Sequence, residues 1–106
     1  MGRTKAVLLP GQQKILHALG ENIKFARLRR DFSAELTAER AGISRVTLSK
    51  VESGDPGAAM GAYLKTLFVL GLERDLLAVA KDDVLGRKLQ DAALLPKKRA
   101  SKKEKR

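Results

Sequence analysis

The sequence contains no cysteine and no tryptophan, and its aromatic residues are one tyrosine and three phenylalanines. Without cysteine the chain can form neither a disulfide framework nor a thiolate metal site. It also lacks a long apolar run, because charged residues interrupt every candidate, and this excludes a membrane-spanning segment. What remains is a chain of 106 residues, 43% of them hydrophobic, which is enough for one modest core plus tails.

Catalytic chemistry has little support in the sequence. The only histidine, His17, stands beside Leu16 and Leu19 in a helical pattern, with no Ser or Cys nucleophile that pairs with it convincingly. The adjacent carboxylates Asp82 and Asp83 are more typical of a helix cap than of a cation site. A glycine-rich phosphate loop is also absent. We therefore expect no enzyme, no catalytic residue, no metal and no cofactor.

Positive charge is concentrated at one end of the chain. The net charge is +10, yet residues 96–106 alone hold seven of the 22 Lys and Arg and one of the 12 Asp and Glu. This stretch has almost nothing apolar to fold around, so it is expected to be a disordered basic tail. Such a tail favours nucleic acid through counterion release. The alternative is a solubilising or cloning-derived tail.

Apolar residues recur at three- and four-residue steps through the rest of the chain, which is typical of helices. The first helical stretch spans 12–30, with a possible break at Gly20. Helices over 34–41 and 45–53 follow, each preceded by a capping serine, Ser33 and Ser44. No alternation of the β type is present, so the sequence predicts an all-α fold, a compact domain of five or six helices.

Three further helices are predicted after a turn at 53–57. The first covers 59–70, the second 73–80, and the third begins after Asp82 or Asp83 and ends before Pro96. The inward face of the 59–70 helix is expected to hold Met60, Tyr63, Leu64, Leu67 and Leu70. These boundaries give three parts, a flexible arm over 1–11, a helical domain over 12–95 and the tail over 96–106.

Residues 33–54 predict a helix-turn-helix. Only Ala41-Gly42-Ile43-Ser44 separates the two short capped helices, and this is too few residues for a long irregular loop. Gly42 suits the positive φ that ends a helix. Helices joined so tightly cross at a steep angle. In the second of them Leu48 and Val51 join Ile43 on one face, and the opposite face is left free.

That free face has the chemistry of a major-groove reader. Arg45 can donate two hydrogen bonds to guanine, Val46 can meet a thymine methyl, and Ser49 and Lys50 can reach base edges or phosphates. Contacts to the DNA backbone are expected from Ser33, Ser44, Thr47, Lys97, Lys98 and Arg99. The competing interpretation is a solvated helix face with two cations, and the tight turn favours the groove reader.

The pattern resembles the Xre family, the Cro/repressor-type helix-turn-helix domains. The matching residues lie between 19 and 72: Leu19-Gly20-Glu21-Asn22-Ile23, Arg27, Ser33, Ala38, Ala41-Gly42-Ile43-Ser44, Leu48-Ser49, Val51-Glu52-Ser53-Gly54 and Pro56. The resemblance implies a structural ion pair between Arg27 and Glu52, with a DNA contact by Arg27 as the alternative. Two positions depart from the family. Ala34 stands where a phosphate-contacting Gln is common. The family usually has a polar residue followed by a large apolar one where this chain has Leu36-Thr37, and this inverted order puts the packing of the 34–41 helix in doubt.

A second, shorter resemblance concerns residues 70–91. The strings Leu70-Gly71-Leu72-Glu73-Arg74-Asp75-Leu76-Leu77 and Asp83-Val84-Leu85-Gly86-Arg87-Lys88-Leu89-Gln90-Asp91 are similar to HipB-like antitoxins. This resemblance implies a repressor that pairs with a HipA-like kinase toxin and regulates its own operon. The alternative interpretation is that Leu85, Leu89 and Ala92, which recur at helical spacing, pack in the core or in a dimer interface.

The sequence therefore leads to one principal hypothesis and one alternative. The principal hypothesis is a cytoplasmic, nucleoid-associated bacterial repressor, a homodimer on double-stranded DNA with a palindromic operator and no membrane partner. The dimer surface is expected in the 73–80 helix and residues 84–95. The alternative is a protein-interaction or bridging module that binds nucleic acid non-specifically through its tail.

Overall fold

The computed structural model describes the backbone of residues 7–104 and the side chains of residues 7–94. Within that range it contains six helices and no strand, which confirms the all-α prediction. The elements are α1 (Pro10–Arg29), α2 (Ala34–Ala41), α3 (Arg45–Ser53), α4 (Met60–Leu70), the 3-10 helix η1 (Glu73–Ala78) and α5 (Val84–Glu104). None of the described helices has the length and apolar character needed to cross a membrane.

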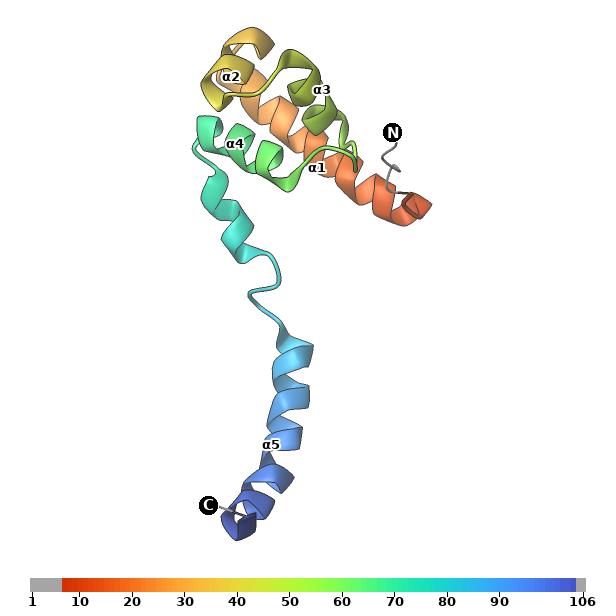
Figure 1. The fold of residues 1–106 in the computed structure, drawn as a ribbon, viewed down its shortest axis with the longest axis vertical. Helices are drawn as coiled ribbons and strands as arrows, with labels where there is room; N and C mark the ends of the chain where they lie inside the picture. Colours follow the sequence, from red (N-terminus) through yellow and green to blue (C-terminus); the bar gives the residue numbers. More distant parts are fainter. Residues whose placement is uncertain (1–6, 105–106) are drawn as a thin grey trace. The chain divides into compact units, whose positions relative to one another are not determined.

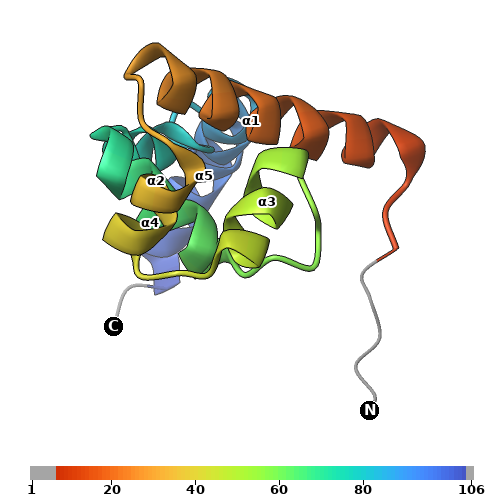
Figure 2. The ribbon, with the colours of Figure 1, turned by 90° about the horizontal axis from the view of Figure 1, so that it is seen from above.

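The chain divides after Leu76 into two units. The first holds α1 to α4 and the start of η1, and the second holds the rest of η1 and α5. This division falls inside the range 12–95 that the sequence analysis treated as one domain. In the first unit α1 runs along one side, and α2, α3 and α4 lie on the other (Figures 1 and 2). The most extensive contact of α1 is with α3.

Helix α1 is continuous, so the break considered at Gly20 does not occur. It also begins at Pro10, inside the range expected to be a flexible arm, with proline in the first turn where its missing N–H costs nothing. Gly20 is buried, and a Cβ there would stand 2.6 Å from the carbonyl oxygen of Val51. The glycine thus allows α1 to approach α3 closely, which is a different role from ending a helix.

The core of the first unit gathers side chains from α1, α3 and α4. Its buried members are Ile23, Ala26, Val51, Ala62, Tyr63, Leu67 and Leu70. Tyr63 can be buried there because its hydroxyl donates a hydrogen bond to the carbonyl of Asp55 at 3.1 Å. Burial, and secondarily the charge of Asp55, raise the pKa of Tyr63 above its ordinary value. The α3–α4 turn is therefore tied to the core through one hydrogen-bonded aromatic side chain.

Two of the apolar residues predicted to face inward on α4 are exposed instead. Met60 is 72% exposed and Leu64 43%. The other three residues predicted on this face, Tyr63, Leu67 and Leu70, are buried, and the small or polar residues Ala62 and Thr66 are buried beside them. Helix α4 is apolar on nearly all sides, so the spacing of its apolar residues identified three of the five inward positions and wrongly added Met60 and Leu64.

Helix α2 packs through a residue that the sequence analysis doubted. Thr37 is fully buried, whereas Leu36 is only partly buried. The methyl group of Thr37 fills the position where a large apolar residue was expected. Its hydroxyl oxygen has no hydrogen-bond partner within the described residues. A buried hydroxyl without a partner carries an uncompensated desolvation cost.

The second unit has few internal contacts of the kind that form a core. The predicted helix over 73–80 is a 3-10 helix that ends at Ala78, and no residue from Leu77 to Leu94 is buried. Asp83 rather than Asp82 caps α5, by accepting from the Gly86 amide at 3.0 Å. Helix α5 continues past Pro96, where order was expected to end. A disordered tail was predicted over residues 96–106. The side chains of this stretch and the whole of residues 105–106 lie outside the described part, so the prediction is not tested there.

Candidate nucleic-acid interface

The α2–turn–α3 segment has the geometry that the sequence predicts. At the start of α2 the Ser33 hydroxyl accepts from the Leu36 amide at 3.0 Å. Gly42 ends α2 with φ +72°, and the Ile43 amide then donates to the Ala38 carbonyl at 3.0 Å. The Ser44 hydroxyl accepts from the Thr47 amide at 3.0 Å and begins α3. The turn is therefore short and hydrogen-bonded at both helix ends, and it holds two separate helices at a fixed angle.

Helix α3 buries one side and exposes the other. Leu48 and Val51 are 1% and 0% exposed and anchor the helix in the core. The four residues predicted to read bases all lie on the outer side: Arg45, Val46, Ser49 and Lys50. Val46 is 65% exposed, so its apolar side chain is available for contact from outside the domain. The arrangement leaves this face free to enter a groove.

Of the residues predicted to contact the DNA backbone, the structure describes the side chains of Ser33, Ser44 and Thr47. Ser33 and Ser44 lie at the N-termini of α2 and α3, where their hydroxyls are occupied as caps. The Ser44 hydroxyl also donates to the Thr47 hydroxyl at 3.0 Å. Any phosphate contact at these positions would thus use a hydroxyl that already has a structural role. Lys97, Lys98 and Arg99 have side chains outside the described part.

Arg27 of α1 and Glu52 of α3 form a buried ion pair. Arg27 Nε lies 2.6 Å from Glu52 Oε2, and Nη2 lies 3.0 Å from Oε1, so the contact is bidentate. The two side chains are 8% and 9% exposed. The remaining Nη1 donates to the Phe32 carbonyl at 2.8 Å. All these donors point into the protein, which favours the structural role of Arg27 over a DNA contact.

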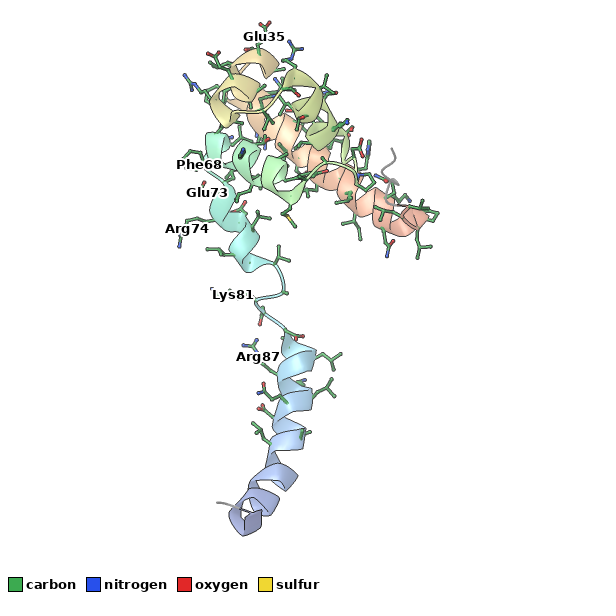
Figure 3. The ribbon with its side chains drawn as sticks, in the orientation of Figure 1. Glu35, Phe68, Glu73, Arg74, Lys81 and Arg87 are labelled. Carbon is green, nitrogen blue, oxygen red and sulfur yellow. The ribbon has the colours of Figure 1, made fainter. Side chains whose placement is uncertain are left out.

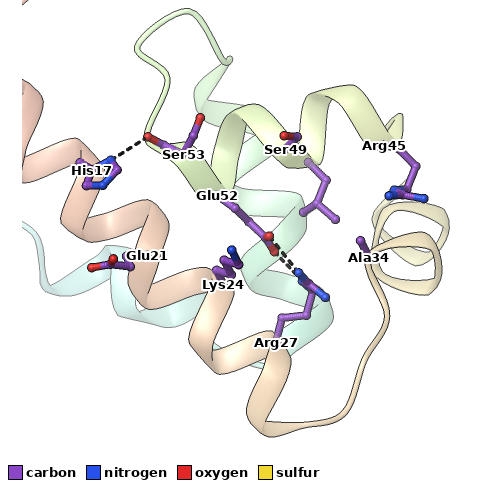
Figure 4. Close-up of a pocket in the computed structure, with 10 residues that line it drawn as sticks. His17, Glu21, Lys24, Arg27, Ala34, Arg45, Ser49, Glu52 and Ser53 are labelled. Atoms are coloured by element: carbon purple, nitrogen blue, oxygen red, sulfur yellow. Dashed lines mark hydrogen bonds and ion pairs between the residues drawn. The ribbon is translucent and has the colours of Figure 1, made fainter.

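A groove lies between α1 and α3, beside the outer face of α3 (Figure 4). Its volume is about 400 Å³, and its lining residues are His17, Glu21, Lys24, Arg27, Ala34, Arg45, Leu48, Ser49, Glu52 and Ser53. The buried ion pair lies between its two walls. The α1 wall was not predicted from the sequence, although His17, Glu21 and Lys24 are spaced at i, i+4 and i+7, the pattern of one polar helix face.

Two contacts fix the N-terminal half of α1 against the end of α3. The Gln13 side-chain amide donates to the Gly54 carbonyl at 2.9 Å, and His17 Nδ1 lies 3.3 Å from the Ser53 carbonyl oxygen. His17 therefore contacts backbone rather than another side chain. Among the described residues no group of three His, Cys, Asp or Glu could hold a metal ion.

Comparison with known protein families agrees with this geometry. Residues 18–80, more than half of the chain, match the family described as helix-turn-helix domain. The matched segment includes α2, the turn and α3 in full, together with the groove wall from α1 beyond His17. The chain has no match among curated proteins. The chain belongs to the helix-turn-helix domain family, and this fold indicates a DNA-binding protein.

Proposed function

We propose that the protein is a sequence-specific transcriptional repressor that binds a palindromic operator as a homodimer. The observation that supports this most strongly is the outer face of α3, where Arg45, Val46, Ser49 and Lys50 are all exposed while the opposite face is anchored in the core. A helix fixed in this way presents its side chains at a constant angle to the groove. The proposal involves binding alone, without a catalytic step or cofactor.

The side chains on this face suit direct readout. Arg45 stands in the first turn of α3 and can donate two hydrogen bonds to the O6 and N7 atoms of one guanine. Val46 offers an apolar surface to a thymine methyl, and Lys50 offers a cation to a phosphate or a base edge. One helix of this length reaches only a few base pairs. A second copy reading a half-site about 10 bp away would supply the rest of the specificity.

We further propose that the repressor is an antitoxin that pairs with a HipA-like kinase and regulates its own operon in the bacterial cytoplasm, near the nucleoid. The support is the resemblance of residues 70–91 to HipB-like antitoxins together with the exposed apolar side chains of α5. Val84, Leu85 and Leu89 are 51%, 68% and 62% exposed, so this helix has an apolar surface available for a partner. A kinase encoded in the adjacent reading frame that copurifies with the protein would support this part.

The test of the DNA-binding proposal is a selection of duplexes from a random pool followed by titration of the selected and random sequences. We expect the selected operator to bind at least about 10³-fold more tightly than random duplex at the same salt concentration. Arg45→Ala should reduce discrimination at one base position by about 1–3 kcal/mol. Arg74→Ala removes the same charge from exposed η1 and is the matched control, which should leave base preference unchanged.

Two results would contradict the proposal. A ratio near unity between selected and random duplex would favour a bridging module that holds a protein partner and touches nucleic acid non-specifically. An Arg45→Ala variant with the same base preferences as Arg74→Ala would show that α3 is not the reading element.

A further inference from the structure

Arg45 has a carboxylate neighbour on α2. Its Nη1 lies 3.7 Å from Oε2 of Glu35, and the two side chains are 60% and 81% exposed. Figure 3 shows Glu35 projecting outward from α2, and Figure 4 shows the Arg45 side chain beside the first residue of that helix, Ala34. The leading candidate for base recognition is thus paired with an acidic side chain at the surface, on the border of the proposed DNA interface.

The turn between the two helices creates this pairing. Glu35 occupies the first turn of α2, and Arg45 occupies the first turn of α3. Ala34 and Arg45 line the same groove, so the starts of the two helices are close neighbours. Ala34 has no side chain beyond Cβ to stand between them. Ala34 stands where resemblance to Xre domains implies a phosphate-contacting Gln, and its short side chain leaves Arg45 free to approach Glu35.

The ion pair contributes little to the stability of the fold, because both groups are well solvated and an exposed pair is screened by water and salt. Its physical effect is on the conformation of Arg45. A free arginine side chain samples many rotamers and loses that freedom when it engages a base. A carboxylate within reach of one guanidinium nitrogen restricts the sampled orientations before DNA arrives, and such preorganisation lowers the cost of binding.

We propose that Glu35 is a positioning residue that orients the Arg45 guanidinium toward one guanine and so sets base discrimination at that position. The inference rests on the proposed function, since it requires that Arg45 reads a base. The 3.7 Å approach of Glu35 to Nη1 is an ion pair without a hydrogen bond, so the guanidinium donors remain free for the O6 and N7 atoms of guanine. Attraction to the carboxylate biases the side of the guanidinium that faces the DNA, which favours this bidentate geometry over looser contacts with other bases.

The experiment uses the full chain and compares Glu35→Gln with Glu39→Gln. Glu39 is exposed on the same helix and forms none of the ion pairs found among the described residues, so it is the matched control. Each variant is titrated with the selected operator and with operators substituted at each half-site position in turn. Both variants lose one negative charge and should therefore bind all duplexes somewhat more tightly.

The two variants should differ only in base preference. We expect Glu35→Gln to lower discrimination at the position read by Arg45 about two- to fivefold, the effect of an exposed ion pair, and to leave the other positions unchanged. Glu39→Gln should leave every position unchanged. In an Arg45→Ala background, Glu35→Gln should have no further effect on discrimination, because the group that it orients is gone.

Two results would overturn the role of Glu35. One is the same base preference in Glu35→Gln and Glu39→Gln, and the other is a Glu35→Gln effect that persists in the Arg45→Ala background. Failure of the proposed function would look different, because Arg45→Ala would then leave every base preference intact. If Arg45→Ala changes the preference and Glu35→Gln does not, only the positioning role is lost.

Discussion

Replacing Arg27 with methionine should destabilise the protein strongly, because it leaves the Glu52 carboxylate without a partner inside the domain. Arg27 makes a bidentate contact with Glu52 at 2.6 and 3.0 Å and also donates to the Phe32 carbonyl at 2.8 Å. The Glu52 side chain is only 9% exposed, so water cannot replace the lost donors fully. Removing one member of a buried pair costs about 3–5 kcal/mol. Small domains have about 5–15 kcal/mol of stability in total.

Urea unfolding followed by circular dichroism measures this loss. For a small protein the free energy of unfolding falls by about 1–3 kcal/mol per molar urea, so the midpoint of Arg27→Met should fall by at least about 1 M. The double variant Arg27→Met/Glu52→Met should lose less than the sum of the two single variants, since it leaves no unpaired charge. Arg74→Met is the control for the loss of an exposed arginine. The reasoning is refuted if Arg27→Met shifts the midpoint no more than Arg74→Met, or if the single effects simply add.

Two further pairs of substitutions test the packing of the first unit, again by urea unfolding. Thr37→Val should raise the free energy of unfolding by about 1 kcal/mol, because it removes a buried hydroxyl that has no partner in the described part of the chain. Thr66→Val is the control, because it removes an equally buried hydroxyl that is hydrogen-bonded, and it should not raise the free energy of unfolding. An increase of the same size in both variants would contradict the explanation. Gly54→Ala should cost about 1–3 kcal/mol more than Gly42→Ala. Both glycines have φ +72° and share the strain of that conformation, but only a Cβ at Gly54 would overlap the carbonyl oxygen of Leu16, whereas Gly42 has nothing within 4 Å. Equal losses would show that this overlap is relieved by backbone movement.

The helix-turn-helix was predictable because its signals are local. Ser33, Gly42 and Ser44 each act through a hydrogen bond or a backbone angle within a few residues, so the printed order of the amino acids is sufficient to place them. The bounds predicted for α2 and α3, 34–41 and 45–53, are those observed. The same local reasoning placed Leu48 and Val51 on the inner face of α3.

Features that depend on tertiary contact were not predictable in the same way. Gly20 was considered as a break, whereas its neighbour in space is the backbone of Val51, far along the chain. Met60 and Leu64 were assigned to the inward face of α4 but are exposed, whereas Ala62 and Thr66 are buried beside the correctly assigned members of that face. Helical periodicity identifies a face only when the other faces are polar, and α4 does not meet this condition.

In the candidate site, too, local features were predictable and tertiary contacts were not. The exposed face of α3 followed from its own spacing, but the pairing of Arg45 with Glu35 did not, because these residues are separated by the turn and belong to different helices. The groove wall formed by His17, Glu21 and Lys24 was missed for the same reason. Its members become neighbours of α3 only when α1 crosses that helix.

The backbone contact between α1 and the end of α3 has a consequence for altering specificity. Gly20 and Gly54 bring main chain against main chain, so the angle of α3 is set by atoms that every residue type shares rather than by the side chains on its outer face. Substitutions at 45, 46, 49 and 50 should therefore exchange the chemistry presented to DNA while the scaffold keeps its geometry. If α3 reads bases as proposed, its preference can be changed by substituting these four surface residues without altering the packing of the domain.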